Sequence, residues 1–224
     1  MRRLAAALLL PALVVPALVV LGTPAAALAQ SAASPQQEAA LPDKRDILRK
    51  AEESLQGIRT MTGRFMQVSS TGAQAEGAVA LQRPGRMRLE YDPPTPVLVV
   101  ADGRFLIYVD EKLNQVSHLP LNQTPAGILL RDNVSFSDPE ITVTDVRQGG
   151  GVVEIDVAMT NDRAAGLMTM VFADKPFELR QWRITDAQGV ETAVTLYNVR
   201  TGVELNQALF AHIPGPLPPG QSYR

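Results

Sequence analysis

The chain contains no cysteine among its 224 residues. Disulfides, thiolate metal sites, cysteine nucleophiles and a lipid-modified N-terminal cysteine are therefore all excluded. A domain without disulfides must be stabilised by its hydrophobic core, and a chain of this length suffices for one such domain.

Neither sign of charge is in clear excess, and histidine is scarce. Lys and Arg number 21 against 23 for Asp and Glu, and no basic stripe is present, which argues against nucleic acid or an anionic membrane surface as a partner. The two histidines, His118 and His212, have no Glu or His at metal-ligand spacing. The sequence also lacks a Gly-x-Ser-x-Gly elbow and a phosphate-binding loop. We therefore expect no metal, no cofactor and no enzymatic activity, with a lipid hydrolase as the alternative.

Long apolar runs are confined to the N-terminus. Residues 1–29 begin with positively charged side chains, continue with an apolar run that two prolines interrupt, and end in small residues. This order is typical of a secretory signal peptide, and we expect cleavage after Ala29. A membrane anchor is the alternative, which the two prolines disfavour. Residues 30–42 are rich in Ala, Ser, Gln and Pro and are expected to form a flexible leader.

The hydrophobic period then predicts a helix followed by many strands. Ile47, Ala51 and Leu55 recur at helical spacing after the N-cap residue Asp43, which predicts an amphipathic helix over residues 43–58. Thr124-Pro125 is expected to cap a short helix over 126–130. Alternation with a period of two predicts about eleven strands. The twelve candidate ranges for these strands are 60–70, 75–83, 86–91, 97–100, 104–109, 113–119, 140–147, 152–158, 167–173, 178–185, 191–199 and 209–213.

Short turns between these strands favour an antiparallel up-and-down sheet. A sheet this large tends to curl, and the two amphipathic helices could cover its concave face. The sequence therefore predicts one mainly β (α+β) domain over 43–215 with a Pro/Gly-rich tail at 216–224. A curved sheet under a helical lid is suited to enclosing an apolar ligand.

Several motifs occur in a fixed order along this domain. They are Phe65-x-Gln67, Gly77, Arg83-Pro84-Gly85, Arg86-x-Arg88-x-Glu90-Tyr91, Asp92-Pro93-Pro94, Val97–Val100, Asp102-Gly103, Tyr108-x-Asp110, Leu113-x-Gln115-Val116 and Thr124-Pro125. With these motifs, and with a cleaved signal peptide before them, the chain resembles the bacterial outer-membrane lipoprotein carrier family, known as LolA. Some family members carry Trp where this chain has Leu89, which leaves cavity width and cargo preference open.

The resemblance implies both a fold and a function. The fold would be an incomplete antiparallel β half-barrel of eleven strands with a lid of two or three helices over an apolar cavity. The function would be that of a periplasmic carrier that shields the acyl chains of lipoproteins and ferries them from the inner to the outer membrane. Its partners would be lipid-modified lipoproteins as cargo, an ATP-driven inner-membrane transporter and, in many bacteria, an outer-membrane receptor lipoprotein. We expect a monomer.

The resemblance also assigns candidate site residues. Arg83 would latch the lid by hydrogen bonding to helix carbonyls near Leu129 and Leu130 when the cavity is empty; the alternative is a solvated arginine at a strand end. Strand alternation and the matched positions give the expected cavity lining, although an ordinary packed core would produce the same pattern. These residues are Phe65, Met87, Leu89, Tyr91, Val97, Val99, Phe105, Ile107, Ile128 and Leu129.

Two other functions are compatible with the same residues. One is a periplasmic sensor domain of the same half-barrel type, which binds lipid or mislocalised lipoprotein and regulates an envelope response. Such proteins usually have a second domain after the half-barrel, and the position of Arg224 soon after the last expected strand favours the carrier. The other is a carrier of a different lipid, such as a glycolipid or a hopanoid.

Overall fold

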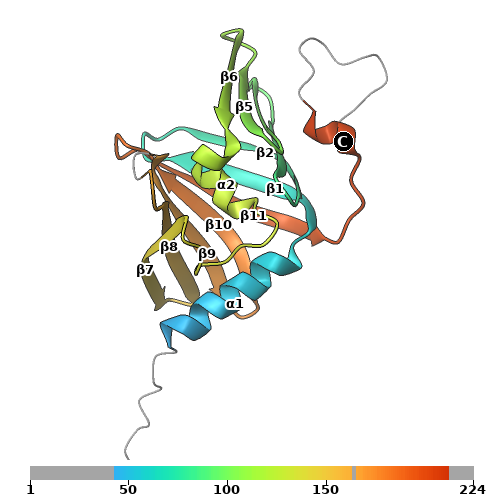
Figure 1. The fold of residues 1–224 in the computed structure, drawn as a ribbon. Helices are drawn as coiled ribbons and strands as arrows, with labels where there is room; N and C mark the ends of the chain where they lie inside the picture. Colours follow the sequence, from blue (N-terminus) through green and yellow to red (C-terminus); the bar gives the residue numbers. More distant parts are fainter. Residues whose placement is uncertain (1–42, 163–164, 212–224) are drawn as a thin grey trace, which may run out of the picture. The chain divides into compact units, whose positions relative to one another are not determined.

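The computed structural model describes residues 43–162 and 165–211 (Figure 1). The expected signal peptide, leader and tail lie outside these residues. Within them, no helix is both long enough and apolar enough to cross a membrane. The elements in chain order are α1 (Lys44–Gly57), β1 (Thr60–Ser69), β2 (Gln74–Gln82), β3 (Arg86–Tyr91), β4 (Val97–Asp102), β5 (Phe105–Asp110), β6 (Gln115–Pro120), η1 (Leu121–Gln123), α2 (Pro125–Leu129), β7 (Ile141–Gly149), β8 (Val152–Met159), β9 (Leu167–Asp174), β10 (Phe177–Thr185), β11 (Glu191–Thr201) and η3 (Gln207–Phe210).

One antiparallel sheet of eleven strands organises the domain, in the order β6-β5-β4-β3-β2-β1-β11-β10-β9-β8-β7. Strands β1 to β6 and β7 to β11 each form a meander of hairpins, and the pairing of β1 with β11 joins the two halves. The sheet does not close into a barrel, because β6 and β7 remain at its two ends. The expected mainly β architecture is confirmed.

Helix α1 forms as its sequence predicts. The side chain of Asp43 accepts a hydrogen bond from the backbone N–H of Arg45 at 3.1 Å, which satisfies one free donor of the first turn. Ile47, Ala51 and Leu55 are buried at four-residue spacing. Burial of this apolar stripe stabilises the packing of α1 on the sheet, since full burial of a large aliphatic side chain contributes about 1.5–3 kcal/mol to the free energy of folding.

The expected strand at 209–213 is wrong in its described part. Residues Gln207–Phe210 form the 3₁₀ helix η3, which the Asn206 side chain caps. Phe210 is buried, and η3 packs against β3 and β4 on the face of the sheet opposite the helices. Adjacent apolar residues at Leu209 and Phe210 do not distinguish a strand at a sheet edge from a turn packed on a sheet face.

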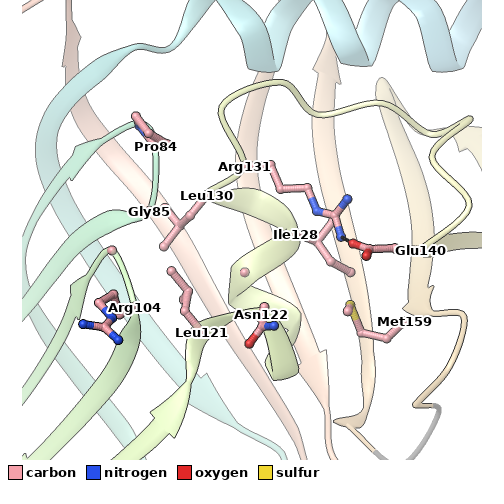
Figure 2. Close-up of a pocket in the computed structure, with 12 residues that line it drawn as sticks. Pro84, Gly85, Arg104, Leu121, Asn122, Ile128, Leu130, Arg131, Glu140 and Met159 are labelled. Atoms are coloured by element: carbon pink, nitrogen blue, oxygen red, sulfur yellow. Dashed lines mark hydrogen bonds and ion pairs between the residues drawn. The ribbon is translucent and has the colours of Figure 1, made fainter.

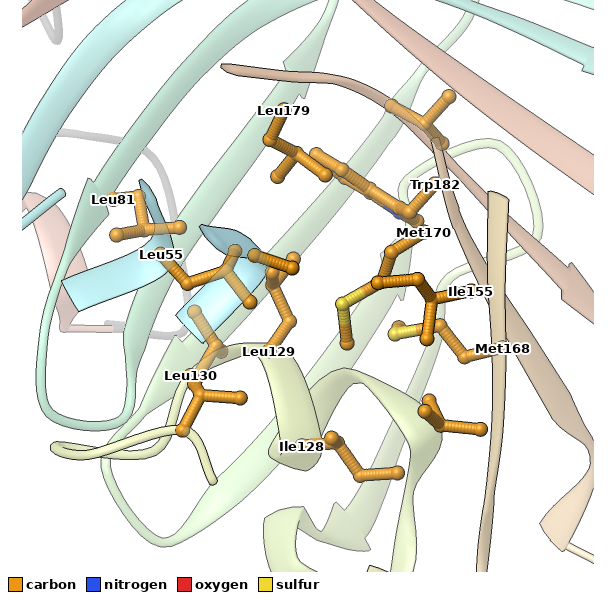
Figure 3. Packing of buried hydrophobic residues seen from close by; sticks show 14 of the residues in the cluster. Leu55, Leu81, Ile128, Leu129, Leu130, Ile155, Met168, Met170, Leu179 and Trp182 are labelled. Atoms are coloured by element: carbon orange, nitrogen blue, oxygen red, sulfur yellow. The ribbon is translucent and has the colours of Figure 1, made fainter. Parts of the chain in front are cut away.

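The core lies on the inner face, defined here as the face of the sheet covered by α1 and α2. Buried side chains from both helices and from both halves of the sheet form one cluster. Figure 3 shows part of it, including Leu55 of α1, Leu129 of α2 and Met170 of β9. Because the two sheet halves contribute to the same cluster, the sheet must curve around the helices.

Gly77 permits the close packing of Phe65 within this core. A Cβ atom at Gly77 would lie 2.2 Å from the carbonyl oxygen of Glu90 and 2.6 Å from the ring of Phe65. Phe65 is fully buried and packs edge-on against Tyr91 with ring centroids 5.0 Å apart. Residue 77 therefore has to be glycine because the neighbouring backbone and ring occupy the space of a side chain.

We predict that Gly77→Ala destabilises the domain by about 1–3 kcal/mol, because the added methyl displaces either β3 or the Phe65 ring. Urea unfolding followed by tryptophan fluorescence measures this change. Gly149→Ala is the matched control, since nothing lies within 4 Å of its Cβ position. Equal stability of the two variants would contradict the proposed crowding at Gly77.

Candidate functional site

Arg83 links the sheet to the end of α1. It lies in the β2–β3 turn, directly after β2, and only 6% of its surface is exposed. Its Nη1 atom donates a hydrogen bond to the carbonyl oxygen of Leu55 in the last turn of α1. The Leu55 carbonyl also accepts a hydrogen bond from the backbone N–H of Ile58 at 3.1 Å, so Arg83 adds a second donor to a carbonyl at the helix C-terminus.

The guanidinium of Arg83 is incompletely paired. Among the described residues, its Nε and Nη2 atoms have no hydrogen-bond partner. Burial, and secondarily the positive charge of Arg59, lower the pKa of Arg83 to about 10, while Asp132 acts in the opposite direction. The cost of burying this charge offsets much of the benefit of its hydrogen bond. The contact between Arg83 and α1 is therefore weak in net free energy.

The predicted partners of Arg83 are corrected by the structure. The carbonyls near Leu129 and Leu130 do not receive its hydrogen bond; the carbonyl of Leu130 accepts one from the backbone N–H of Gly85 at 2.8 Å instead. Helix α2 spans only five residues, and this backbone bond occupies its C-cap. The β2–β3 turn thus contacts both helices, through a side chain to α1 and through the backbone to α2.

Most of the expected cavity residues lie together on the inner face. Phe65 and Tyr91 both pair with Gly77, and Leu89 pairs with Val99 across β3 and β4. Residues directly opposite each other in an antiparallel pair share a face. By alternation, the same face holds Met87 and Val97. Ile128 and Leu129 of α2 belong to the core cluster that packs against it.

Phe105 and Ile107 lie on the opposite face, so their assignment to the cavity is wrong. Ile107 pairs with Val100 and with His118, whereas Val99 pairs with Tyr108. Phe105 contacts His118 edge-on, with ring centroids 6.2 Å apart. The inner-face residues of β5 are instead Leu106 and Tyr108. Alternation along β5 alone could not identify its inner face, because that requires the register with β4.

The side chains of α2 occupy the concave side of the sheet. Ile128, Leu129 and Leu130 are each 1% exposed and pack against residues of both sheet halves. A pocket of about 440 Å³ lies beside α2, at the rim of the inner face (Figure 2). It is lined by Pro84, Gly85, Gly103, Arg104, Leu121, Asn122, Gly127, Ile128, Leu130, Arg131, Glu140 and Met159.

This pocket has an apolar wall and a polar rim. Arg131 donates to Glu140 at 2.8 Å across one side, which neutralises part of its charge (Figure 2). Ile128 and Leu130 line the pocket and also belong to the buried cluster. A ligand that enters from this rim would therefore meet α2 first, and it would have to displace α2 side chains to reach the inner face. The sequence did not single out the polar residues of this rim, because the pocket lining comes from six separate segments of the chain.

We predict that Arg83→Leu changes the free energy of unfolding by less than about 1 kcal/mol, because loss of the bond to Leu55 is offset by removal of a buried charge. Urea unfolding at neutral pH measures this. Leu55→Ala, which truncates an apolar side chain at the same contact, should cost about 2–5 kcal/mol. A loss above about 3 kcal/mol in Arg83→Leu would show that the hydrogen bond outweighs the cost of burial.

The model of the family "Outer membrane lipoprotein carrier protein LolA" matches residues 56–212. The chain is 29% identical over 180 residues to the outer-membrane lipoprotein carrier protein of Pseudomonas syringae pv. syringae (strain B728a), and 30% identical over 178 residues to that of Azotobacter vinelandii. Each alignment covers 75% of this chain and 82% of the relative. The solved structure of a LolA superfamily protein from Nitrosomonas europaea is 10% identical, with a TM-score of 0.43, over 75% of this chain and 97% of that protein.

Proposed function

Since the chain belongs to the outer membrane lipoprotein carrier protein LolA family, we propose that it is a periplasmic carrier of lipoproteins. In this role it shields the acyl chains of its cargo between the inner and the outer membrane, and it catalyses no reaction. The cargo would come from an ATP-driven transporter in the inner membrane. An outer-membrane receptor lipoprotein could accept it.

The observation that best supports this proposal is the apolar inner face and its cover by the five-residue helix α2. Acyl chains in water carry a cost of about 0.8 kcal/mol per exposed methylene. A long chain therefore requires an apolar wall of the kind that β1, β3 and β4 provide. In the closed form, Ile128 and Leu129 pack against the part of this wall that an acyl chain would contact.

Loading, in this proposal, exchanges one set of apolar contacts for another. Acyl chains replace the side chains of α2 on the inner face, so the sheet residues lose little van der Waals contact. The remaining cost is the exposure of the displaced α2 side chains and the rupture of the bonds from the β2–β3 turn to Leu55 and Leu130. The Arg83 bond adds little to this cost because it is weak in net terms.

A binding assay with a triacylated peptide tests the proposal. We expect the purified protein to bind this peptide and to leave the same peptide without acyl chains unbound. Mass spectrometry of protein purified from periplasm should identify lipoproteins as the co-purified molecules. Free lipid alone would favour a carrier of another lipid, and absence of any lipid together with failure to bind the triacylated peptide would refute the carrier function.

Arg83→Leu tests how release is controlled. Without the bond to Leu55, the closed empty form is less stable relative to the loaded form, so loading should persist while release weakens by about two- to fivefold. Transfer of the triacylated peptide from the loaded protein to acceptor vesicles measures release. Arg86→Leu, which removes another arginine from the same turn region, is the control and should release normally.

A further inference from the structure

A row of polar contacts joins α1, and Arg59 just after its end, to the segment that follows α2. Gln56 Nε2 donates to Asn133 Oδ1 at 2.6 Å, and Arg59 Nη1 donates to Asp132 Oδ1 at 2.5 Å. Glu52 completes this row one turn earlier on the same side of α1. We call these contacts, made by Glu52, Gln56 and Arg59 with residues 132–136, the α1 seam.

Glu52 makes the most buried contact of the seam. Its Oε1 atom accepts a hydrogen bond from the backbone N–H of Phe136 at 2.6 Å and another from Ser135 Oγ at 3.2 Å. Phe136 and its neighbour Val134 are buried in the core cluster. A charged acceptor on a backbone N–H beside the core forms a stronger bond than the exposed pairs at Gln56 and Arg59.

The seam has a consequence for Arg83, whose side chain contacts α1 alone. The side chains that fill the inner face belong to α2, and no described hydrogen bond links Arg83 to α2. The two helices share the apolar cluster, and the α1 seam adds a polar connection between them, since residues 132–136 follow α2 and its cap. Through this connection, loss of the Arg83 bond at α1 can also free α2.

We propose that Glu52 is a positioning residue that makes α1 and residues 125–136 move as one body, so that loss of the Arg83–Leu55 bond also frees α2. Only the role assigned to this coupling, the regulation of cargo loading, rests on the proposed carrier function. The mechanical coupling itself exists with or without cargo. It can therefore be measured on the empty protein.

Amide hydrogen exchange measures the coupling in four proteins: wild type, Arg83→Leu, Glu52→Ala and the double variant. In the wild-type background, Arg83→Leu should accelerate exchange in both 44–57 and 125–136 by about two- to fivefold, in line with the small net free energy of the Arg83 contact. In the Glu52→Ala background, Arg83→Leu should accelerate only 44–57. Equal acceleration of 125–136 in both backgrounds would overturn the proposal.

Glu53→Ala is the matched control. Glu53 is the exposed neighbour of Glu52 on α1, and it pairs with Arg49 at 2.7 Å rather than with the α2–β7 segment. Arg83→Leu should accelerate both segments in this background. Glu52→Gln, which keeps an oxygen acceptor for the Phe136 N–H, should also preserve the coupling. A purely structural role of Glu52 would change exchange rates without removing the dependence of 125–136 on Arg83.

A covalent substitute for the seam gives a second test. Because the chain has no cysteine, Gln56→Cys with Asn133→Cys introduces the only two thiols. A short bifunctional thiol reagent that joins them in the Glu52→Ala background should restore the effect of Arg83→Leu on 125–136. Unlinked protein should not show this restoration, and its absence after linking would contradict the coupling.

The two proposals can fail separately. Coupled exchange without binding of the triacylated peptide would refute the carrier function and leave the role of Glu52 intact. Peptide binding with independent exchange of the two segments would refute the role of Glu52 and leave the carrier function intact.

Discussion

The inner face of the sheet has to be kept from water, and the rest of the structure depends on how this is done. Strands from both halves contribute buried Leu, Ile, Val, Met and Phe side chains to one cluster. Helix α1 covers part of this face with three residues at four-residue spacing. The remainder is covered by α2, a five-residue helix whose Ile128 and Leu129 are almost wholly buried, and by Val134 and Phe136 in the segment after it.

A helix of five residues is unusually short for the cover of a permanently packed core. Isolated helices this short are unstable in water, so α2 is held by its packing and its caps rather than by its own hydrogen bonds. Thr124 caps its start and Gly85 binds its end. The incompletely paired Arg83 fits the same pattern, because a contact that gains little on forming also costs little to break. The closed form is therefore stable enough to protect the inner face and weak enough to open.

Much of the fold could be predicted from the sequence because the relevant information is local. Strand β3 has the predicted bounds, since alternation and the flanking turns mark both of its ends. The existence and approximate bounds of α1 follow in the same way from its cap and its apolar stripe. Phe65, Met87, Leu89 and Tyr91 share one face, as alternation within their strands predicts, while their role as a cavity lining stays a prediction.

The errors arise where a prediction needed information from a distant segment. Phe105 and Ile107 were assigned to the wrong face because only the register of β5 against β4 relates their faces. The acceptor of Arg83 was placed on α2, although the end of α1 lies closer in the folded chain. Glu52 was not singled out at all, because an acidic residue on the polar side of an amphipathic helix carries no sign that it meets Phe136 84 residues later.

The pairing of β1 with β11 has a consequence for how the chain reaches this state. Phe65 pairs with Leu196, so the centre of the sheet forms only by closing a loop of more than one hundred residues. Each half can form from neighbouring hairpins, but the entropy of loop closure makes their union slow relative to local steps. A chain whose last strand is not yet available for pairing would expose the inner edges of both halves. Completion of the fold must therefore wait until the chain is free to pair as far as residue 201.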